Sequence, residues 1–235
     1  MDAMFRFGSP FNRSRLARRP SVRTLGIFSS KGGTGKTTIA LHLAVAANAA
    51  GLKVLIADLD PQRSALAWQM ERRNQAVRVI APMPNKLKEL RTTAAMGGFD
   101  FLIIDTPPVI GPHAMEALGA SHFAIAVTRT NSFDIWAMSK ITALFKEAGL
   151  PAAFVLNQVP SPRSGKELPV TTAAIESLQA YGIPVAPVGL RSRAVYANST
   201  AEGRCAQEVR PESVAAQEVE ALFQYVWAKM TESVG

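Results

Sequence analysis

The sequence contains very little cysteine, and this narrows the chemistry that the chain can perform. Cys205 is the one cysteine among 235 residues, so a disulfide within the chain and a site built from several thiolates are both excluded. His42, His113 and His122 are scattered and do not have metal-ligand spacing. A chain without a disulfide framework is typical of a reducing compartment, and we therefore expect a cytoplasmic protein.

Long apolar segments are also missing. No run of 18 apolar residues occurs, so we predict no membrane-spanning helix, and the first residues lack the apolar core of a secretory signal. The last 24 residues place apolar side chains at helical spacing but hold one lysine, Lys229, against four glutamates. Because a helix that lies on a membrane needs a basic polar face, we expect this helix to pack on the sheet and expect no membrane partner.

Acidic residues are outnumbered by basic ones. The chain has 18 Asp and Glu against 26 Lys and Arg, a formal net charge of +8 and a pI near 10.0. This balance suggests a polyanionic partner such as nucleic acid or an anionic membrane. A plain solvated basic surface would have the same composition, so charge alone leaves both interpretations open.

Residues 1–23 differ from the rest of the chain. They carry six arginines against one acid, and Pro10 and Pro20 interrupt any helix. We expect a flexible basic arm over residues 1–23, followed by a single domain over residues 24–235. The arm has two interpretations, an electrostatic tether to DNA or a leader without a function of its own.

From residue 24 onward, apolar runs alternate with helical patterns. This alternation predicts an α/β fold, a mainly parallel twisted sheet flanked by helices on both faces, whose ligands bind beyond the carboxyl ends of the strands. The run 99–105 leaves no room for polar alternation and is expected to be a central strand. The expected strands are 24–30, 53–58, 77–81, 99–105, 122–128, 152–159 and 185–188, and the expected helices are 37–50, 64–74, 85–96, 132–149, 170–181 and 212–230.

The segment KGGTGKTT, residues 31–38, lies between the first expected strand and the first expected helix. This context is that of a P-loop, in which glycines let backbone N–H groups surround a phosphate and the helix N-terminus adds partial positive charge. Lys36 is predicted to contact the β- and γ-phosphates, Thr37 to bind Mg²⁺, and Thr38 to reach the α-phosphate. The predicted nucleotide-binding residues of this loop are Lys31, Gly32, Gly33, Thr34, Gly35, Lys36, Thr37 and Thr38.

Three acidic residues follow expected strands. Asp58 and Asp60 lie in DLDPQ, just after the second strand, and Asp105 ends the buried run FLIID. A buried strand that ends in an acid is the Walker B arrangement, so Asp105 is predicted to hold Mg²⁺. DLDPQ alone is ambiguous, because acids in a helix N-terminal turn also interact with the helix dipole. Beside a P-loop, a metal–nucleotide role is favoured.

Three motifs in order resemble the ParA/MinD family of deviant Walker A P-loop ATPases, and within it the short ParA-type partition ATPases. The usual loop has a glycine where this sequence has Ser30, and here Lys31 follows as a second lysine. DLDPQ and FLIIDTPP are the other two motifs, and the resemblance covers about residues 23–230. It implies an Mg²⁺-dependent ATPase that forms a homodimer around ATP.

The resemblance also assigns roles to individual residues. It implies that Asp60 orients the attacking water, that Asp58 supports the metal shell, and that Lys31 reaches across the dimer to the partner's phosphates. A solvent-facing Lys31 is the alternative. The resemblance also places Asn157 at the adenine, with a second adenine contact in the segment 187–191. An asparagine with only a turn-forming role is the alternative for Asn157. The implied catalytic residues are Lys31, Lys36 and Asp60, and the implied metal-binding residues are Thr37, Asp58 and Asp105.

The segment VGLRSRAVYANSTAEGRC, residues 188–205, resembles the part of the family that contacts DNA without sequence preference. Arg191 and Arg193 are the implied DNA-binding residues, and Arg163 and Lys166 in the preceding loop are second candidates. Such contacts go to phosphates, so binding should fall steeply with salt. A solvated helix start is the alternative.

Three functions remain open at this point. The first is an ATPase that partitions plasmid or chromosomal DNA on the nucleoid, released from DNA when a ParB-like or other adaptor stimulates hydrolysis. The second is an ATPase that tracks along the nucleoid and positions a protein cargo, such as a chemoreceptor array or a carboxysome. The third is a metabolic P-loop enzyme that uses ATP to activate a small carboxylate or amide. DLDPQ and Lys31 argue against the third.

Overall fold

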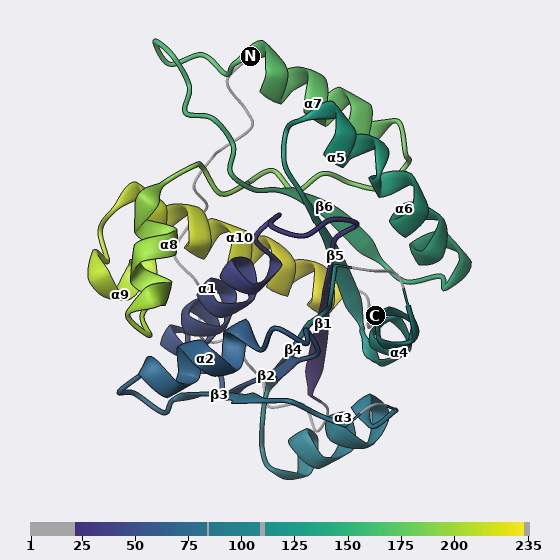
Figure 1. The fold of residues 1–235 in the computed structure, drawn as a ribbon, viewed down its shortest axis with the longest axis vertical. Helices are drawn as coiled ribbons and strands as arrows, with labels where there is room; N and C mark the ends of the chain where they lie inside the picture. The colour runs from purple at the N-terminus through teal and green to yellow at the C-terminus, as the bar shows by residue number, and fades with distance from the viewer. Residues whose placement is uncertain (1–21, 84, 109–110, 233–235) are drawn as a thin grey trace.

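The structure is a computed structural model that describes residues 22–83, 85–108 and 111–232. Its centre is one sheet whose six strands are all parallel and follow the order β3-β2-β4-β1-β5-β6 (Figure 1). This confirms the predicted α/β fold. The strands are β1 (Arg23–Phe28), β2 (Val54–Asp58), β3 (Val77–Ile80), β4 (Phe101–Asp105), β5 (Phe123–Thr128) and β6 (Ala152–Leu156).

Helices cover both faces of the sheet (Figure 1). One hydrophobic core lies under α1, α2, α8, α9 and α10, and a second lies under α3, α4, α5, α6 and α7 on the other face. The bounds are α1 (Lys36–Ala49), α2 (Ser64–Glu71), α3 (Leu87–Met96), α4 (Pro112–Ala120), α5 (Ser132–Trp136), α6 (Met138–Glu147), α7 (Pro169–Gln179), α8 (Ala194–Ala201), α9 (Ala206–Val209) and α10 (Val214–Glu232).

Strand β4 is buried along its whole length. Phe101 and Ile103 belong to the first core, whereas Leu102 and Ile104 belong to the second. Because successive side chains of a strand point to opposite faces, a strand covered on both faces has no position for a polar residue until it ends. The first acid, Asp105, therefore appears at the carboxyl end of β4, where ligands of parallel sheets bind.

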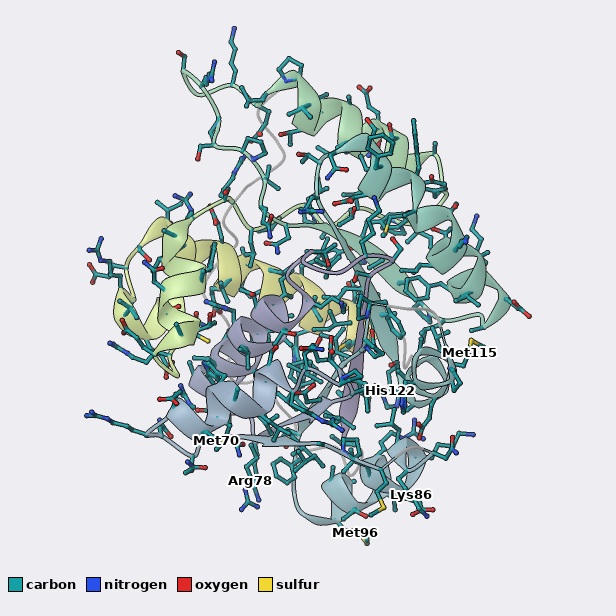
Figure 2. The ribbon with its side chains drawn as sticks, in the orientation of Figure 1. Met70, Arg78, Lys86, Met96, Met115 and His122 are labelled. Carbon is teal, nitrogen blue, oxygen red and sulfur yellow. The ribbon has the colours of Figure 1, made fainter. Side chains whose placement is uncertain are left out.

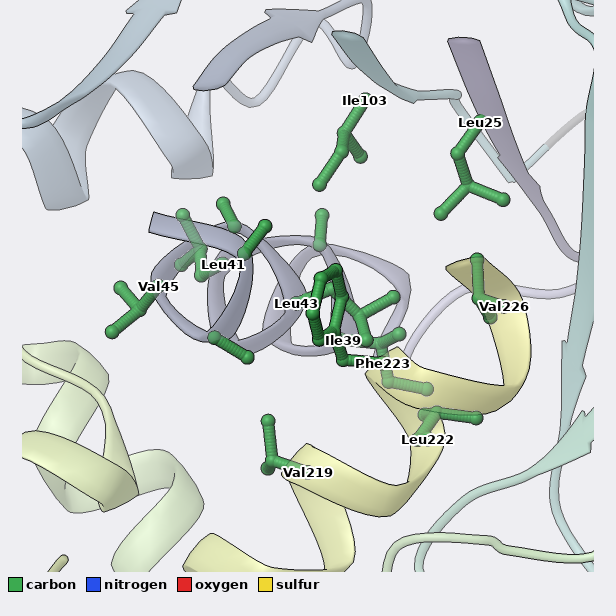
Figure 3. Close-up of a cluster of buried hydrophobic side chains, with 14 of the residues drawn as sticks. Leu25, Ile39, Leu41, Leu43, Val45, Ile103, Val219, Leu222, Phe223 and Val226 are labelled. Atoms are coloured by element: carbon green, nitrogen blue, oxygen red, sulfur yellow. The ribbon is translucent and has the colours of Figure 1, made fainter. Parts of the chain in front are cut away.

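Helix α10 packs on the sheet together with α1 (Figure 3). Phe223 of α10 is 0% exposed, and full burial of such a side chain contributes about 2–3 kcal/mol. This fixes α1, the helix that follows the glycine-rich loop, and it agrees with the expected packing of the C-terminal helix. None of the helices in the described ranges is both long enough and apolar enough to cross a membrane. The cluster in Figure 3 includes Leu25, Ile39, Leu43, Ile103, Leu222, Phe223 and Val226.

The structure corrects several expectations about elements. The expected strand 185–188 is a single bridge between Val185 and Phe154. The ladder ends there because Leu156 accepts the N–H of Leu190 rather than that of Val188, which a continued register would use. The expected helix 132–149 is divided at Ala137 into α5 and α6. Arg23, which the predicted arm includes, is buried and begins β1, and residues 1–21 of that arm lie outside the described residues. Helices α4, α8 and α9 were not predicted from the sequence patterns.

Candidate functional site

The glycine-rich loop lies after β1, at the edge of the sheet where β2 and β4 also end. Gly33 and Gly35 have φ angles of 72° and 91°, in the left-handed region that glycine adopts without steric cost. A Cβ at Gly35 would lie 2.0 Å from the Nδ2 atom of Asn157, whereas a Cβ at Gly32 or Gly33 would meet nothing within 4 Å. The loop therefore has open space beside its backbone, which a bound phosphate requires.

Lys36 is buried inside this loop, with 6% of its surface exposed. Its Nζ atom donates to the Ser29 hydroxyl at 2.9 Å, and that hydroxyl donates to the Lys31 carbonyl at 2.8 Å. Burial lowers the pKa of Lys36, while the nearby charges of Asp105 and Asp60 act in the opposite direction. An ammonium has three donors, so Lys36 keeps donors for an anion in the loop.

Asp105 is fully buried at the end of β4 and accepts a hydrogen bond of 2.6 Å from the Thr37 hydroxyl through Oδ2. Burial raises the pKa of Asp105 to about 7, although the Thr37 hydrogen bond and the Lys36 charge act to lower it. Its other oxygen, Oδ1, has no hydrogen-bond partner within the described ranges. A buried carboxylate oxygen without a partner is costly, so this atom marks a position where a cation would be stabilised.

Unpartnered polar atoms gather at this edge of the sheet. Within the part of the chain that the structure describes, seven buried side-chain N or O atoms lack a hydrogen-bond partner. Three of them belong to the site: Ser30 Oγ, Thr34 Oγ1 and Asp105 Oδ1. Because native proteins leave few such atoms without a partner, their concentration indicates a polar ligand here.

Asp58 organises the turn that carries Asp60. Its Oδ1 accepts the Asp60 N–H at 3.1 Å, and its Oδ2 accepts the N–H groups of Ala65 and Leu66 at 3.1 and 3.2 Å. Burial raises the pKa of Asp58, and these backbone hydrogen bonds together with the Arg63 charge oppose the rise. Both oxygens are thus engaged at the N-terminus of α2, which argues against direct metal ligation and for a role in positioning Asp60.

Asp60 itself is half-buried and lies near the charged side chains of Lys36 and Asp105. Its Oδ1 accepts the Gln62 N–H at 2.9 Å, and its charge acts on both Lys36 and Asp105. The structure therefore brings Lys36, Thr37, Asp58, Asp60 and Asp105 together, as the motifs predict. Their catalytic, nucleotide-binding and metal-binding roles stay predictions.

Lys31 does not extend away from the chain. Its Nζ atom lies 3.1 Å from Oδ1 of Asp134 in α5, and 5.7 Å from the centre of the Phe133 ring. Asp134 is 1% exposed, and its Oδ2 also accepts hydrogen bonds from Arg129 and Asn131 at 2.6 and 2.9 Å. Burial opposes the charged form of Asp134, yet these hydrogen bonds and the one from Lys31 hold its pKa below the usual range.

Asn157 connects β6 to the glycine-rich loop. Its Nδ2 atom donates to the Thr34 carbonyl at 2.7 Å, and the neighbouring Gln158 donates from Nε2 to the Gly33 carbonyl at 3.2 Å. The amide oxygen of Asn157 is therefore available for the expected adenine contact, while its amide nitrogen already holds the loop. The segment 187–191 runs beside this strand end, because the Val159 N–H donates to the Leu190 carbonyl at 3.0 Å.

The two arginines implied as DNA contacts both form ion pairs inside the chain, and for the buried Arg191 this argues against a direct contact. Arg191 is 6% exposed and donates to both carboxylate oxygens of Glu167 and to the Pro160 carbonyl. Arg193 donates to Glu218, with 2.6 Å between Nη2 and Oε1, and this hydrogen bond raises the pKa of Arg193. The buried Arg191 guanidinium cannot reach a phosphate on a neighbouring duplex without breaking its pairs. The Arg193 side chain is 31% exposed, so its DNA contact stays a prediction.

Four residues that contact the site could not be predicted from the sequence. Ser29, Asp134, Asn131 and Gln158 each bind a motif residue or its partner, but none belongs to a recognisable motif. Asn131 and Asp134 share a short N-cap pattern, in which the Asn131 side chain accepts the Asp134 N–H. That pattern predicts a helix start, and only the folded chain shows that the helix start faces Lys31.

Comparison with known proteins places these motifs in a family. The CobQ/CobB/MinD/ParA nucleotide binding domain matches residues 25–204. Maintenance of carboxysome distribution protein A from Halothiobacillus neapolitanus is 28% identical over 190 residues, which cover 77% of this chain and 84% of that protein. Chromosome-partitioning ATPase Soj from Thermus thermophilus is 25% identical over 163 residues, which cover 56% of this chain and 66% of Soj, just under two thirds of its length.

Solved structures agree with the fold. The septum site-determining protein MinD from Pyrococcus horikoshii, complexed with Mg-ADP, superposes with a TM-score of 0.69 and 26% sequence identity. The match covers 86% of this chain and 95% of MinD. The fold is therefore shared with a protein that was solved in complex with Mg-ADP.

Proposed function

The chain belongs to the CobQ/CobB/MinD/ParA nucleotide-binding domain family, and from this premise we propose that it is a ParA-like ATPase that dimerises on binding ATP, binds DNA without sequence preference and partitions plasmid or chromosomal DNA. The observation that carries this proposal is the convergence of Lys36, Thr37 and Asp105 at one sheet edge, with a second lysine, Lys31, at the loop entrance. In the cell, a ParB-like or other adaptor would stimulate hydrolysis while the protein is cytoplasmic and nucleoid-associated.

The glycine-rich loop is proposed to bind the phosphates of ATP. The open space at Gly32 and Gly33 and the unpartnered hydroxyls of Ser30 and Thr34 support this assignment. Lys36 would contact the β- and γ-phosphates, since its buried ammonium keeps unused donors. Burial strengthens this contact, because a charge pair is screened less away from water.

The residues at the end of β4 fit Mg²⁺. Mg²⁺ prefers hard oxygen ligands, and Asp105 offers a buried carboxylate oxygen without a partner beside the Thr37 hydroxyl. Thr37 and Asp105 would hold the ion, which when bound would neutralise charge on the β- and γ-phosphates. The Mg-ADP complex of the Pyrococcus horikoshii protein supports the same ion for this chain.

Asp60 is proposed to orient the water that attacks the γ-phosphate. Its carboxylate acts electrostatically on Lys36 and Asp105, so it lies near the proposed phosphate position. Asp58 holds the Asp60 N–H and the start of α2, and the Gln62 N–H donates to Oδ1 of Asp60, which orients the Asp60 side chain. A carboxylate placed in this way catalyses by positioning and by accepting a proton from water.

Lys31 is proposed to act across the dimer. To reach the phosphates of a second chain, it must leave Asp134, whose remaining donors Arg129 and Asn131 stay in place. The ammonium would then stabilise phosphate charge in trans, as an arginine finger does.

Two variants test the proposed ATPase. Lys36→Ala should abolish ATP binding, whereas Asp60→Ala should bind ATP and stop turning it over. Fluorescent-nucleotide titration measures binding, and phosphate release measures turnover. Tight ATP binding by Lys36→Ala would contradict the loop assignment, and rapid turnover by Asp60→Ala would contradict the catalytic one. Arg78→Ala, at an exposed position on β3 (Figure 2), is the matched control and should leave both activities unchanged.

A second candidate function is the positioning of a protein cargo along the nucleoid. The observation that favours it is the match to the carboxysome distribution protein, which covers 84% of that relative. Deleting the gene in its host separates the two functions. Plasmid or chromosome loss supports DNA partition, whereas clustering of a protein assembly with normal DNA inheritance supports cargo positioning.

A further inference from the structure

Residues 160–167, between β6 and α7, form a basic hairpin (Figure 1, the green loop between those elements). Arg163 and Lys166 exchange two backbone hydrogen bonds, of 3.0 and 2.9 Å, so they are paired directly across the hairpin. Between them, Ser164 and Gly165 have φ angles of 49° and 75°. Two positive φ angles in a two-residue turn are those of a type I′ hairpin, which is a compact and defined turn.

This turn places two positive charges opposite each other at the hairpin tip. Like charges directly across a strand pair are destabilising. Both Arg163 and Lys166 are exposed, and neither takes part in an ion pair with any residue of the described ranges. The isolated chain therefore keeps an unfavourable pair of cations that a polyanion would turn into a favourable contact.

The base of the hairpin is clamped from inside. Arg191 donates to the Pro160 carbonyl at one end and to the Glu167 carboxylate at the other. Arg191 is 6% exposed, and a bidentate arginine–carboxylate pair has a fixed geometry. This arginine thus holds the two ends of the hairpin together while the tip projects into solvent.

The hairpin also starts beside the nucleotide loop. Gln158, two residues before Pro160, donates to the Gly33 carbonyl, and its own φ of 53° turns the chain away from β6. The tip is therefore carried by the same sheet edge as the proposed ATP site. A ligand held at the tip lies on the side of the molecule where the nucleotide is held.

We propose that Arg163 and Lys166 contact the phosphate backbone of duplex DNA, and that Arg191 is a positioning residue that clamps the hairpin. The inference rests on the DNA binding in the proposed function and deepens it by naming the contact surface. Paired cations match a duplex strand, which carries one phosphate about every 3.4 Å of its axis. The segment 160–167 contains no large apolar side chain, whereas a membrane contact buries apolar surface, so DNA is the favoured polyanion.

The test compares two double variants. The hairpin variant carries Arg163→Gln and Lys166→Gln, and the control carries Arg78→Gln and Lys88→Gln. Arg78 and Lys88 are exposed on β3 and α3, and their replacement changes the net charge by the same amount. Binding of the ATP-loaded protein to a labelled duplex is followed by fluorescence anisotropy over a salt series. The hairpin variant should bind on the order of tenfold more weakly, with a salt slope reduced by about 1 for each lost phosphate contact.

Two further variants separate contact from positioning. Arg163→Lys with Lys166→Arg keeps both charges and should retain binding. Arg191→Gln removes the clamp and should weaken binding at every salt concentration while leaving the salt slope near that of the wild type, because Arg191 touches no phosphate. An Arg191→Gln slope reduced by about 1 would instead make Arg191 a direct contact and overturn the division of roles.

Each outcome decides the proposal. If the wild type binds duplex and the hairpin variant binds equally well with the same slope, the hairpin assignment fails while the proposed function stands. If the wild type binds no duplex in any nucleotide state, the DNA part of the proposed function fails and the hairpin assignment fails with it. If the hairpin variant lost binding to phosphatidylserine–phosphatidylcholine vesicles while its DNA binding stayed unchanged, the hairpin would be assigned to a lipid surface. That result would overturn the DNA contact.

Discussion

Lys31 is held by Asp134 of its own chain, although the proposed dimer requires it at the phosphates of a second chain. The two positions exclude each other. The lysine side chain is 39% exposed and that of Asp134 is 2% exposed, so solvent screens the pair from the lysine side and the pair contributes on the order of 1 kcal/mol. When Lys31 leaves, Asp134 keeps two other donors, both on Oδ2, so the carboxylate stays paired although Oδ1 loses its lysine partner. At the residue scale, this pair would add a small free-energy cost to the proposed dimerisation.

The first prediction concerns this pair. Asp134→Asn should shift ATP-dependent dimerisation to a several-fold lower protein concentration, because Lys31 is released. Lys31→Ala should lose the ATP-dependent dimer while its ATP affinity stays within a few-fold of the wild type. Sedimentation with a slowly hydrolysed ATP analogue measures the dimer. A fall in affinity without a change in dimerisation would make Lys31 an ordinary ligand of its own subunit.

A second residue-scale prediction concerns pH. His42 on α1 is 0% exposed, and its Nε2 atom accepts the Ala206 N–H at 3.1 Å. Burial lowers the pKa of His42 from 6.5 to about 4, although the Thr38 carbonyl and the Glu208 charge act to raise it. The unfolded chain therefore binds more protons between these values, so stability is full above pH 6.5 and falls as the pH drops toward 4.

The loss should reach about 3 kcal/mol near pH 4. Urea denaturation at a series of pH values measures it. His42→Gln keeps an acceptor for the Ala206 N–H and should flatten this part of the pH profile. An unchanged acid-side slope in that variant would assign the pH dependence to other groups. His113→Gln, at a half-buried position on α4, is the control.

At the scale of elements, α2 is attached to the segment before α9. Trp68 donates from its indole nitrogen to the Arg204 carbonyl at 3.1 Å, and Arg72 just after α2 donates to the Gly203 carbonyl at 3.0 Å and to Glu208 at 2.7 and 2.9 Å. Gly203 has a φ of 66°, and a Cβ there would lie 2.5 Å from the backbone nitrogen of Arg72. The helix that follows Asp60 is thereby fixed to the C-terminal part of the domain.

The prediction at this scale is that Arg72→Ala destabilises the fold by about 3 kcal/mol. Its side chain is 3% exposed, and removing one member of a buried pair leaves the Glu208 carboxylate without its partner. Arg73→Ala changes a neighbouring exposed arginine and should cost less than about 0.5 kcal/mol. Urea midpoints of the two variants measure the difference, and equal midpoints would show that the buried pair contributes nothing.

Strands were easier to predict than the contacts between elements. The run FLIID gives β4 directly, because a strand buried on both faces needs apolar residues at every position. The motif residues Lys36, Thr37 and Asp105 are predictable for a related reason, since their local context repeats wherever a phosphate is bound after a strand. The attachment of Lys31 to Asp134 is not predictable in this way, because it joins positions about a hundred residues apart.

Arginines show the same limit most clearly. Arg191 and Arg193 stand in a segment that the family resemblance assigns to DNA, and their sequence context gives no sign that Glu167 and Glu218 will reach them. Acids from other parts of the chain decide whether an arginine is left on the surface or is held inside the fold. Charge composition can therefore suggest a class of partner, but it does not identify the residues that would bind it.

At the scale of the whole molecule, the buried polar groups of the site carry an uncompensated free-energy cost. Asp105 is fully buried with one oxygen unpartnered, and burial raises the pKa of Asp105 to about 7 and lowers the pKa of Lys36. ATP with Mg²⁺ would supply the missing partners for both. Ligand binding should therefore raise stability by mass action, by about 2.7 kcal/mol at a concentration 100 times the Kd.

The last prediction follows from this cost. ATP with Mg²⁺ should raise the Tm by roughly 5–10 °C for a chain of this size, and EDTA should remove most of the gain. Asp105→Asn removes the buried charge while an amide oxygen can still accept from Thr37. This variant should therefore have a higher Tm than the wild type without ligand and a much smaller response to Mg²⁺. If Asp105→Asn melted lower without ligand yet responded fully to Mg²⁺, the carboxylate would be part of the scaffold, and the ion would be held elsewhere. A higher Tm without ligand together with a weak response to Mg²⁺ would mean that the chain gives up stability at this position in order to bind the metal–nucleotide complex.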